Sequence, residues 1–253
     1  WFNFKSSGKA RKNATWYSKG RYYTFDDNGV MTSDWYDLAV ASNTNGVATG
    51  TNGGENAYTS EDGSKGTGWV YTENAAESDS YWYYLVSVKS TDGKNTYRNI
   101  PFNSQSGDDM MRAKVIKGKT YIFNADGTME DGRVILGYNT PNDYKGGAVS
   151  KALTAGVYYF NESDGSSNGQ MVTGKTKDGE DYYYYFDKTT GRAVTDIVKD
   201  GVVYGHDGER IDAEDGNTNA IVTLDHDTYY NKKVNGTTCE YIKAGSRVIV
   251  SST

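Results

Sequence analysis

The chain has 253 residues, a formal net charge of −6 at pH 7 and 36% hydrophobic residues. The negative charge argues against a nucleic-acid partner, because contacts to phosphate groups require a basic surface. No run of about 18 apolar residues occurs, so the sequence predicts no membrane span.

Residue usage favours strands over helices. The chain has 23 tyrosines and 30 glycines but only five leucines. Tyrosine suits a pleated surface, leucine favours helices, and glycine marks turns. The sequence therefore predicts an all-β protein. The single cysteine, Cys239, excludes an internal disulfide and does not decide the compartment.

The first third of the chain is irregular and holds every tryptophan. Two polar segments, Tyr36–Lys65 and Thr72–Asp79, interrupt the pattern described below. We expect a long loop over residues 37–66, and loops of that length are usually either functional or disordered. Whether this loop becomes ordered on binding a ligand is left open. The tryptophans are Trp1, Trp16, Trp35, Trp69 and Trp82.

A motif of glycine and aromatic residues recurs along the chain. In Gly20–Met31, the first glycine is followed by Phe25 five residues later and by Gly29 nine residues later. The segment Gly118–Met129 has the same spacing. The remaining copies contain insertions or substitutions. They are Ser80–Leu85 after Gly68–Trp69, Gly156–Met171, Gly179–Ala193, Gly201–Ile211 and a partial copy at Tyr241–Val248.

Each copy has the pattern of a β-hairpin. A Lys-Gly or Asp-Gly pair supplies the positive φ angles of a tight turn, and the strand after it sends alternate rings to opposite faces. A second turn follows, and a small apolar residue after it begins a strand that can cover the phenylalanine of the motif. The first turns are expected at Lys19-Gly20, Lys117-Gly118, Asp178-Gly179 and Asp200-Gly201. The covering residues are expected to be Met31, Met129, Met171, Ala193 and Ile211.

A single hairpin cannot bury a core alone, so neighbouring hairpins must stack on one another. The predicted fold is therefore a solenoid-like stack of β-hairpin repeats with an irregular, loop-rich N-terminal half. We expect three parts. These are tryptophan-rich residues 1–112 with the long loop, regular hairpin repeats at 113–215, and a terminal partial repeat or cap at 216–253.

The repeat resembles a known bacterial family. Its Gly-x-Trp/Tyr-Tyr-Phe-Asp and Asp/Asn-Gly-x-Met elements are clearest in Trp16–Trp35, Ala113–Gly132 and Val157–Thr195. These elements resemble the cell-wall-binding and glucan-binding repeat, and the resemblance covers residues from about Trp16 to Ile211. Members of that family include choline-binding modules and the glucan-binding regions of glucansucrases. The resemblance implies a stacked-hairpin fold and a secreted or bacterial cell-surface location.

The ligand implied by the family depends on one position of the motif. In the choline-binding members, the ligand lies in a cage of two tryptophans and a tyrosine from adjacent repeats, which is a cation–π site. In this sequence the first aromatic position holds no tryptophan. The residues there are Arg21, Thr120, Val157 and Tyr182 or Tyr183. This departure favours a neutral sugar as the ligand over choline bound in repeated cages.

The tryptophan-rich part is the candidate binding region. An indole has a flat apolar face that suits stacking on a pyranose ring, and nearby Asn, Asp and Lys side chains can bond sugar hydroxyls. The alternative is that these tryptophans are core residues of their own repeats. The predicted ligand-binding residues are Trp35, Tyr36, Trp69, Tyr71, Trp82 and Tyr84.

Motifs for other chemistry do not fit the contexts that they need. Gly165–Gly169 matches Gly-x-Ser-x-Gly, but no helical pattern follows it. His206 and His226 have no Cys or second His at a ligand spacing. Acidic pairs such as Asp108-Asp109 and Glu180-Asp181 have the character of solvated turn residues. The sequence therefore predicts no catalytic residue, no cofactor site and no metal site.

Together these observations predict a non-catalytic carbohydrate-binding module of a secreted or surface protein. The favoured partner is an α-glucan such as starch or dextran, ahead of peptidoglycan or teichoic-acid choline. The alternative is a structural spacer, a wall-anchoring segment or an adhesin that uses the same stack without a sugar site of its own.

Overall fold

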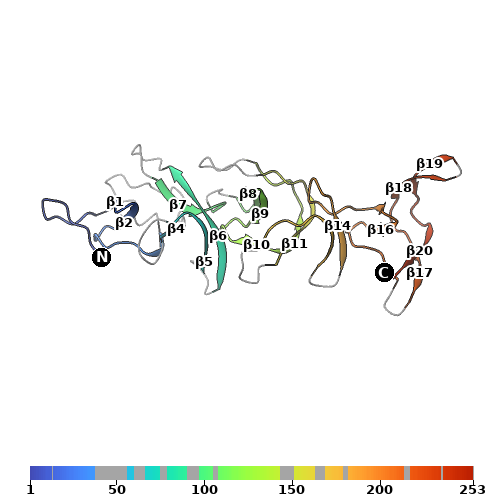
Figure 1. The fold of residues 1–253 in the computed structure, drawn as a ribbon, viewed down its shortest axis with the longest axis horizontal. Helices are drawn as coiled ribbons and strands as arrows, with labels where there is room; N and C mark the ends of the chain where they lie inside the picture. Colours follow the sequence, from blue (N-terminus) through green and yellow to red (C-terminus); the bar gives the residue numbers. More distant parts are fainter. Residues whose placement is uncertain are drawn as a thin grey trace. The chain divides into compact units, whose positions relative to one another are not determined.

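The computed structural model describes residues 1–12, 14–37, 56–59, 66–74, 79–89, 97–104, 108–142, 151–162, 169–178, 182–213, 217–234 and 236–252. Regular structure in these residues consists of strands, and none of them lies in a helix (Figure 1). The predicted all-β class is confirmed. Across the same residues there is no helix long and apolar enough to cross a membrane.

The strands form small sheets of two to four members, mostly antiparallel hairpins. In the first half they are β1 Ala14–Ser18, β2 Arg21–Phe25, β3 Asp34–Asp37, β4 Asn56–Thr59, β5 Gly68–Glu73, β6 Ser80–Lys89, β7 Tyr97–Pro101, β8 Arg112–Ile116, β9 Lys119–Phe123 and β10 Met129–Glu130. In the second half they are β11 Gly132–Leu136, β12 Gly156–Phe160, β13 Gly174–Lys177, β14 Tyr183–Phe186, β15 Ile197–Lys199, β16 Val202–Tyr204, β17 Asn219–Thr223, β18 Thr228–Val234, β19 Thr237–Ile242 and β20 Arg247–Ser251.

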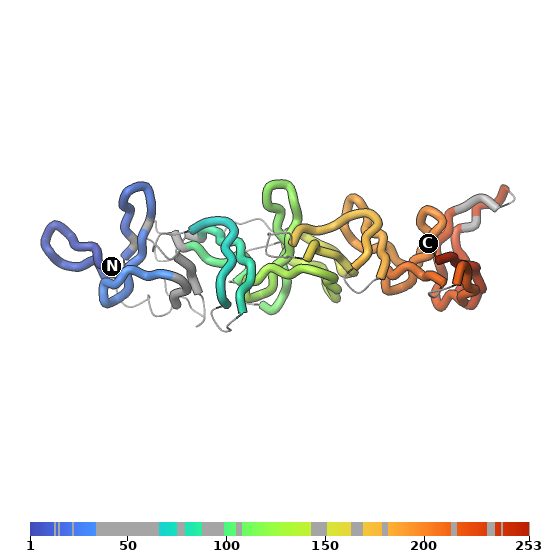
Figure 2. Tube along the Cα trace, turned by 60° about the horizontal axis from the view of Figure 1, so that its bottom comes forward, coloured from blue at the N-terminus to red at the C-terminus, as the bar shows by residue number. Residues whose placement is uncertain are grey.

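The chain divides into two compact units. Unit 1 consists of Trp1–Glu130 with Thr140–Ala152, and unit 2 consists of Asp131–Asn139 with Leu153–Thr253. In unit 2 the hairpins follow one another in chain order (Figure 2), as stacked repeats require. The predicted division at residues 113 and 216 concerns how regular the repeats are, and it stays a prediction.

The tight turns of three hairpins form where the sequence places them. Both turn residues have positive φ: +46° and +84° at Lys19-Gly20, +49° and +80° at Lys117-Gly118, and +53° and +82° at Asp200-Gly201. This is the geometry of a type I′ turn, whose twist matches the two flanking strands.

The fourth predicted turn, at Asp178-Gly179, is wrong. Lys177 pairs with Tyr183, so the connection between β13 and β14 takes residues 178–182. Asp178 receives the backbone N–H of Tyr182 on its carboxylate, at 2.9 Å. A longer loop closed by an aspartate side chain therefore replaces the two-residue turn.

The phenylalanine of each regular repeat is the centre of its core. Phe25, Phe123, Phe160 and Phe186 are all buried. Each pairs through its backbone with the covering residue that the sequence predicts. The pairs are Phe25–Met31, Phe123–Met129, Phe160–Met171 and Phe186–Ala193.

The fifth repeat closes one residue earlier than expected. Tyr204, which replaces the phenylalanine, pairs with Arg210 and not with Ile211. Ile211 instead packs against a cluster of Val203, Leu224 and Val250. The prediction that Ile211 covers the core residue of its repeat is therefore wrong. Arg210 occupies the pairing position because it is the second residue after the turn glycine, as Met31 is in the first repeat.

One turn glycine also serves as a packing contact. Gly127 has φ +93°, and a β-carbon added there would collide with the side chain of Pro101 and lie 3.2 Å from the Phe102 carbonyl oxygen. Glycine is therefore needed twice at this position, for its backbone conformation and for the close approach of β7.

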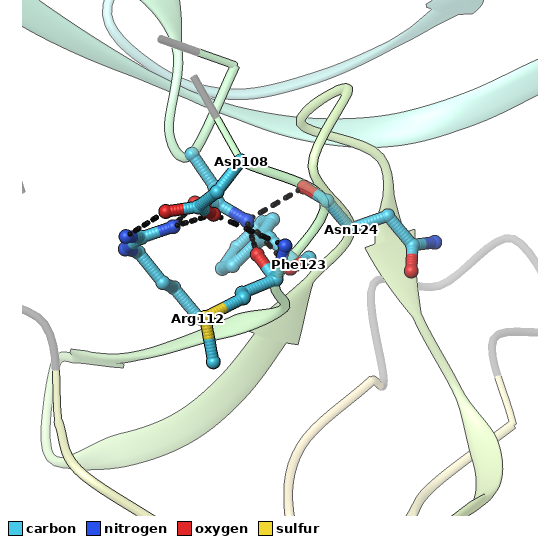
Figure 3. A network of polar contacts seen from close by, with 6 residues as sticks. Asp108, Arg112, Phe123 and Asn124 are labelled. Atoms are coloured by element: carbon cyan, nitrogen blue, oxygen red, sulfur yellow. Dashed lines mark hydrogen bonds and ion pairs between the residues drawn. The ribbon is translucent and has the colours of Figure 1, made fainter. Parts of the chain in front are cut away.

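A buried polar network ties the end of β7 to the β8–β9 hairpin (Figure 3). Arg112 forms two bonds to Asp108, at 2.8 and 2.9 Å, and donates a third to the Asn103 side-chain oxygen at 3.0 Å. The Asn103 amide donates to the carbonyls of Met110, Phe123 and Asn124. Asn103 has φ +75°, so its strained backbone is held by its own side chain.

Unit 2 ends in a different arrangement from the predicted partial repeat at Tyr241–Val248. β19 pairs with β18, whereas β20 pairs with β17. The start of β18 also joins the repeat before it, because Ile197 on β15 pairs in parallel with Tyr229. The last strands are therefore anchored on the fifth repeat.

Candidate functional site

Four of the six predicted binding residues lie on one face of the β5–β6 hairpin. The antiparallel register places Trp69 opposite Tyr84 and Tyr71 opposite Trp82. Because side chains alternate along a strand, these four rings project from the same side. We call them the aromatic face.

The Trp69 end of the aromatic face is part of the unit 1 core. The Trp69 ring lies 4.8 Å from the Tyr121 ring, 5.3 Å from Tyr84 and 5.9 Å from Phe123, on which it stacks. Trp69, Trp82 and Tyr84 all pack against the buried cluster around Phe123. Trp69 therefore has the structural role that the sequence left open for the tryptophans.

The Tyr71 end faces outward. Tyr71 is 55% exposed, and its ring lies 5.2 Å from Trp82 at an angle of 44°. Among the described residues, no cationic side chain lies over the Tyr71 ring.

Polar groups surround the aromatic face. Beyond the end of β5, Asn74 donates a hydrogen bond to Asp126, at 3.2 Å. Glu73, the last residue of β5, is exposed and lies opposite Ser80. On the core side, the Lys114 ammonium is 6.0 Å from the Tyr84 ring, and burial lowers the pKa of Lys114. Of these groups, Glu73 shares the face of β5 that carries Tyr71.

The other two predicted residues, Trp35 and Tyr36, belong to β3. Their backbones pair with Tyr58 and Ala57 of β4. Their side chains lie outside the described part of the chain, so their place relative to the aromatic face stays a prediction. Strand β4 falls within the region expected to be one long loop, so residues 56–59 correct that expectation. Residues 38–55 and 60–65 are outside the described residues.

A second aromatic site, which the sequence reasoning did not select, lies at the β1–β2 hairpin. Trp16 is opposite Tyr23, so both rings are on one face. Trp1 joins them because its carbonyl accepts the backbone N–H of Met31, at 2.8 Å. Together with Phe2, Asn3, Ser18, Lys19, Phe25 and Met31, they line a pocket of about 370 Å³.

This pocket combines two tryptophans and a tyrosine, the residue set of the choline cage. The Trp16 ring, however, is already covered by a cation of the chain. The Arg11 guanidinium lies 3.3 Å from the ring centroid and donates to the Asn3 side-chain oxygen at 2.7 Å. The pairing could have been found from the sequence, since Trp16 and Tyr23 are equally distant from the Lys19-Gly20 turn.

The structure assigns turn roles to several acidic residues. Asp26 accepts the backbone N–H groups of Asn28 and Val30, and Asp187 accepts those of Thr189 and Thr190. These bonds lower the pKa of Asp187. Asp108 forms an ion pair with Arg112. Glu180, Asp181 and most of Gly165–Gly169 lie outside the described residues.

The chain was compared with known proteins. No family model matches it, and no curated protein sequence matches it. Solved structures that match include cell-wall and choline-binding repeat proteins, the class that the motif resembles. One is choline-binding protein F from Streptococcus pneumoniae, with a TM-score of 0.49 and 20% identity over 81% of this chain and 49% of that chain.

Two further matches are larger proteins. The modular autolysin LytC from Streptococcus pneumoniae, in complex with a synthetic peptidoglycan ligand, has a TM-score of 0.34 and 14% identity over 88% of this chain and 43% of that chain. Alternansucrase in complex with isomaltononaose has a TM-score of 0.30 and 17% identity over 83% of this chain and 16% of that chain. The chain thus spans about half the length of choline-binding protein F and less of the other two.

Proposed function

We propose that this chain is a non-catalytic carbohydrate-binding module of a secreted or cell-surface protein. Its partner is a polysaccharide, with an α-glucan such as starch or dextran favoured over peptidoglycan or choline. The observation that carries the proposal is the aromatic face, in which the Tyr71 ring is 55% exposed and lies next to Trp82.

The chemistry of this surface fits a sugar. A pyranose presents axial C–H groups on one side, which pack against an aromatic ring, and hydroxyl groups around its rim, which need hydrogen-bond partners. Tyr71 and Trp82 supply the rings. Glu73, two residues after Tyr71 on the same face of β5, supplies a hydrogen-bond acceptor near them. The preference for an α-glucan follows from the resemblance of the repeat motif to glucan-binding repeats.

The size of the site sets the expected affinity. One exposed ring with a partly buried neighbour makes a shallow site, and shallow sites bind weakly as single copies. Linked sites raise the overall affinity without any new contact. We therefore expect weak binding to a single oligosaccharide and clear retention on an insoluble polymer.

A second candidate function is a spacer or wall-anchoring segment without a sugar site. The observation that favours it is the packing of Trp69, Trp82 and Tyr84 on the core, which gives three of the four rings a structural reason to be present. The two functions differ in what they require of Tyr71. A spacer has no use for an exposed ring at this position.

The experiment is a pull-down of the full chain with insoluble starch, cross-linked dextran and purified peptidoglycan. The variant is Tyr71→Ala, because Trp69→Ala would disturb the core. Tyr241→Ala is the matched control, since Tyr241 is 49% exposed on β19 of the other unit. Trp16→Ala tests the pocket at the β1–β2 hairpin, and free choline is the competitor for it.

We expect retention on one of the glucans and about a five- to tenfold loss of affinity in Tyr71→Ala, the size of one lost ring contact. Tyr241→Ala should bind as the parent chain does. Equal retention of Tyr71→Ala and the parent chain would remove the aromatic face from the proposal. Retention on no polysaccharide would leave the spacer as the better function.

A further inference from the structure

Two histidines that are far apart in the sequence lie together in unit 2. His206 is in the turn after β16, and His226 is in the connection between β17 and β18. Their rings are stacked, with centroids 4.2 Å apart and planes inclined by 10°. Asp196, just before β15, contacts the first of them: its carboxylate is 2.8 Å from His206 Nδ1.

These three side chains form a compact set of ligand atoms. The nitrogen and oxygen atoms that they offer all lie within 4.8 Å of one another. His206 and His226 are exposed, with 68% and 46% of their side chains accessible, so their rings can turn toward a shared point. In a metal site the ligands lie at about 2.0–2.2 Å from the ion, so binding would require the two rings to turn out of their stacked arrangement.

The backbone holds the three segments in register. The Asp196 N–H donates to the carbonyl of Gly205, the residue before His206, at 3.0 Å. The Asp196 carbonyl accepts the N–H of Tyr229, three residues after His226, at 2.7 Å. One residue is therefore bonded to both histidine-bearing segments, and its side chain points at one of the rings.

Neither His206 nor Asp196 is required by the hairpin itself. In the turn of the other repeats, the position of His206 holds Asp27 or Ala125. Asp196 has φ +49°, a conformation that a glycine would adopt at lower cost. A strained backbone at a residue whose side chain can bind a ligand indicates that this side chain has a function.

The surroundings favour a cation. His226 Nδ1 lies 3.1 Å from Asp225, and this contact orients the ring so that Nε2 is left as the ligand atom. The hydrogen bond to Asp196, with smaller contributions from the charges of Asp225 and Asp207, raises the pKa of the His206 imidazole. These three carboxylates make the surroundings of the two rings negative when the imidazoles are neutral.

We propose that Asp196, His206 and His226 form a binding site for a divalent transition-metal ion, with zinc as the expected occupant. Two imidazoles and a carboxylate suit zinc, copper and nickel, whereas calcium and magnesium prefer oxygen ligands. The ion would join the turn after β16 to the β17–β18 connection. It would thereby fasten the last strands of unit 2 to the fifth repeat.

This chain offers a clean test, because it has only two histidines and one cysteine. Zinc chloride is titrated calorimetrically into the full chain without a histidine tag, and cobalt chloride is used to record the visible spectrum. The variants are His206→Asn, His226→Asn and both together. Cys239→Ser controls for a thiolate ligand, and Asp200→Asn controls for the loss of one acidic charge outside the cluster.

We expect one zinc ion per chain, at least about tenfold weaker binding in each histidine variant, and none in the double variant. Zinc should raise the unfolding temperature of the parent chain and not that of the double variant. Protons compete with the metal for the imidazole nitrogens, so zinc affinity should fall as the pH is lowered. Cys239→Ser and Asp200→Asn should bind as the parent does.

Three results would overturn the site. One is unchanged zinc affinity in the double histidine variant, which would place the ion elsewhere. Another is equal affinity for magnesium and zinc, which would indicate a diffuse acidic surface. The third is loss of binding in Cys239→Ser with full binding in the histidine variants. Circular dichroism of each zinc-free variant shows that its strands are intact, so none of these outcomes reflects unfolding.

Discussion

The β5–β6 hairpin of unit 1 and the β13–β14 hairpin of unit 2 are both rich in aromatic residues, but their exposed rings have different neighbours. Strand β14 reads Tyr183 to Phe186 with Tyr184 and Phe186 buried. Its outward rings carry cations of the chain itself. The Arg210 guanidinium lies 4.1 Å from the Tyr183 ring, and the Lys199 ammonium lies 5.3 Å from Tyr185.

At the outer end of the β5–β6 hairpin, no cation among the described residues lies over the exposed ring of Tyr71, which lies beside Trp82. The difference shows that rings of similar content and spacing can differ in their neighbours. Most of the buried rings stabilise the stack, and we propose that a ligand binds where a ring stays exposed.

The largest expected effect tests whether buried and uncovered rings have separate roles. Phe186→Ala removes a fully buried ring and should lower the free energy of unfolding by about 3–5 kcal/mol. Tyr71→Ala should change it by less than about 0.5 kcal/mol, as exposed positions usually do. Urea unfolding measures both. A cost for Tyr71→Ala similar to that of Phe186→Ala would show that Tyr71 is a core residue, and the comparison would fail.

A second prediction concerns how the turn between β9 and β10 supports the β5–β6–β7 sheet, which carries the aromatic face. Gly127→Ala forces a β-carbon against Pro101 at a positive φ. Gly118→Ala is the matched control, because Gly118 has φ +80° but nothing within 4 Å of an added β-carbon. Both lose about 1–2 kcal/mol from the backbone conformation, and Gly127→Ala should lose about 1–3 kcal/mol more from overpacking.

Urea unfolding of the two glycine variants gives this difference directly. Equal losses would mean that the contact between Gly127 and Pro101 contributes nothing. Glycan retention should be lost in Gly127→Ala only under conditions where unit 1 is unfolded, because Gly127 does not belong to the aromatic face.

The core of the repeats was predictable because it depends on local spacing. A two-residue turn fixes which residues lie opposite each other, so Phe25 and Phe123 could be placed from the glycines around them. The same counting would have paired Trp16 with Tyr23. It failed at Asp178-Gly179 because a side-chain bond from Asp178 to Tyr182 closes a longer loop.

The histidine cluster was beyond sequence reasoning for a different reason. His206 and His226 are 20 residues apart, with strand β17 between them. They meet because β18 pairs in parallel with β15, and because β17 is paired with the distant β20. No local spacing encodes these two pairings. In the same way, a cation over a ring depends on packing between repeats, so the sequence could not separate Tyr71 from Tyr183.

The smallest expected effect concerns the cation that lies over an outward ring. Lys199→Gln removes the charge over Tyr185 and should lower the free energy of unfolding of unit 2 by about 0.5–1 kcal/mol, the usual strength of a cation–π contact near the surface. Lys175→Gln is the matched control, because Lys175 is exposed on the neighbouring strand β13 and lies over no ring of the described residues.

The effect should be measured at low and at high salt. A charge acting on a ring at the surface is weakened by screening ions, so the loss in Lys199→Gln should shrink as salt is added. The control should show no loss at either salt concentration. If Lys199→Gln is as stable as Lys175→Gln, the cation over Tyr185 contributes nothing to the free energy of unfolding. The lack of a described cation over Tyr71 would then no longer separate a proposed ligand-binding ring from a structural one.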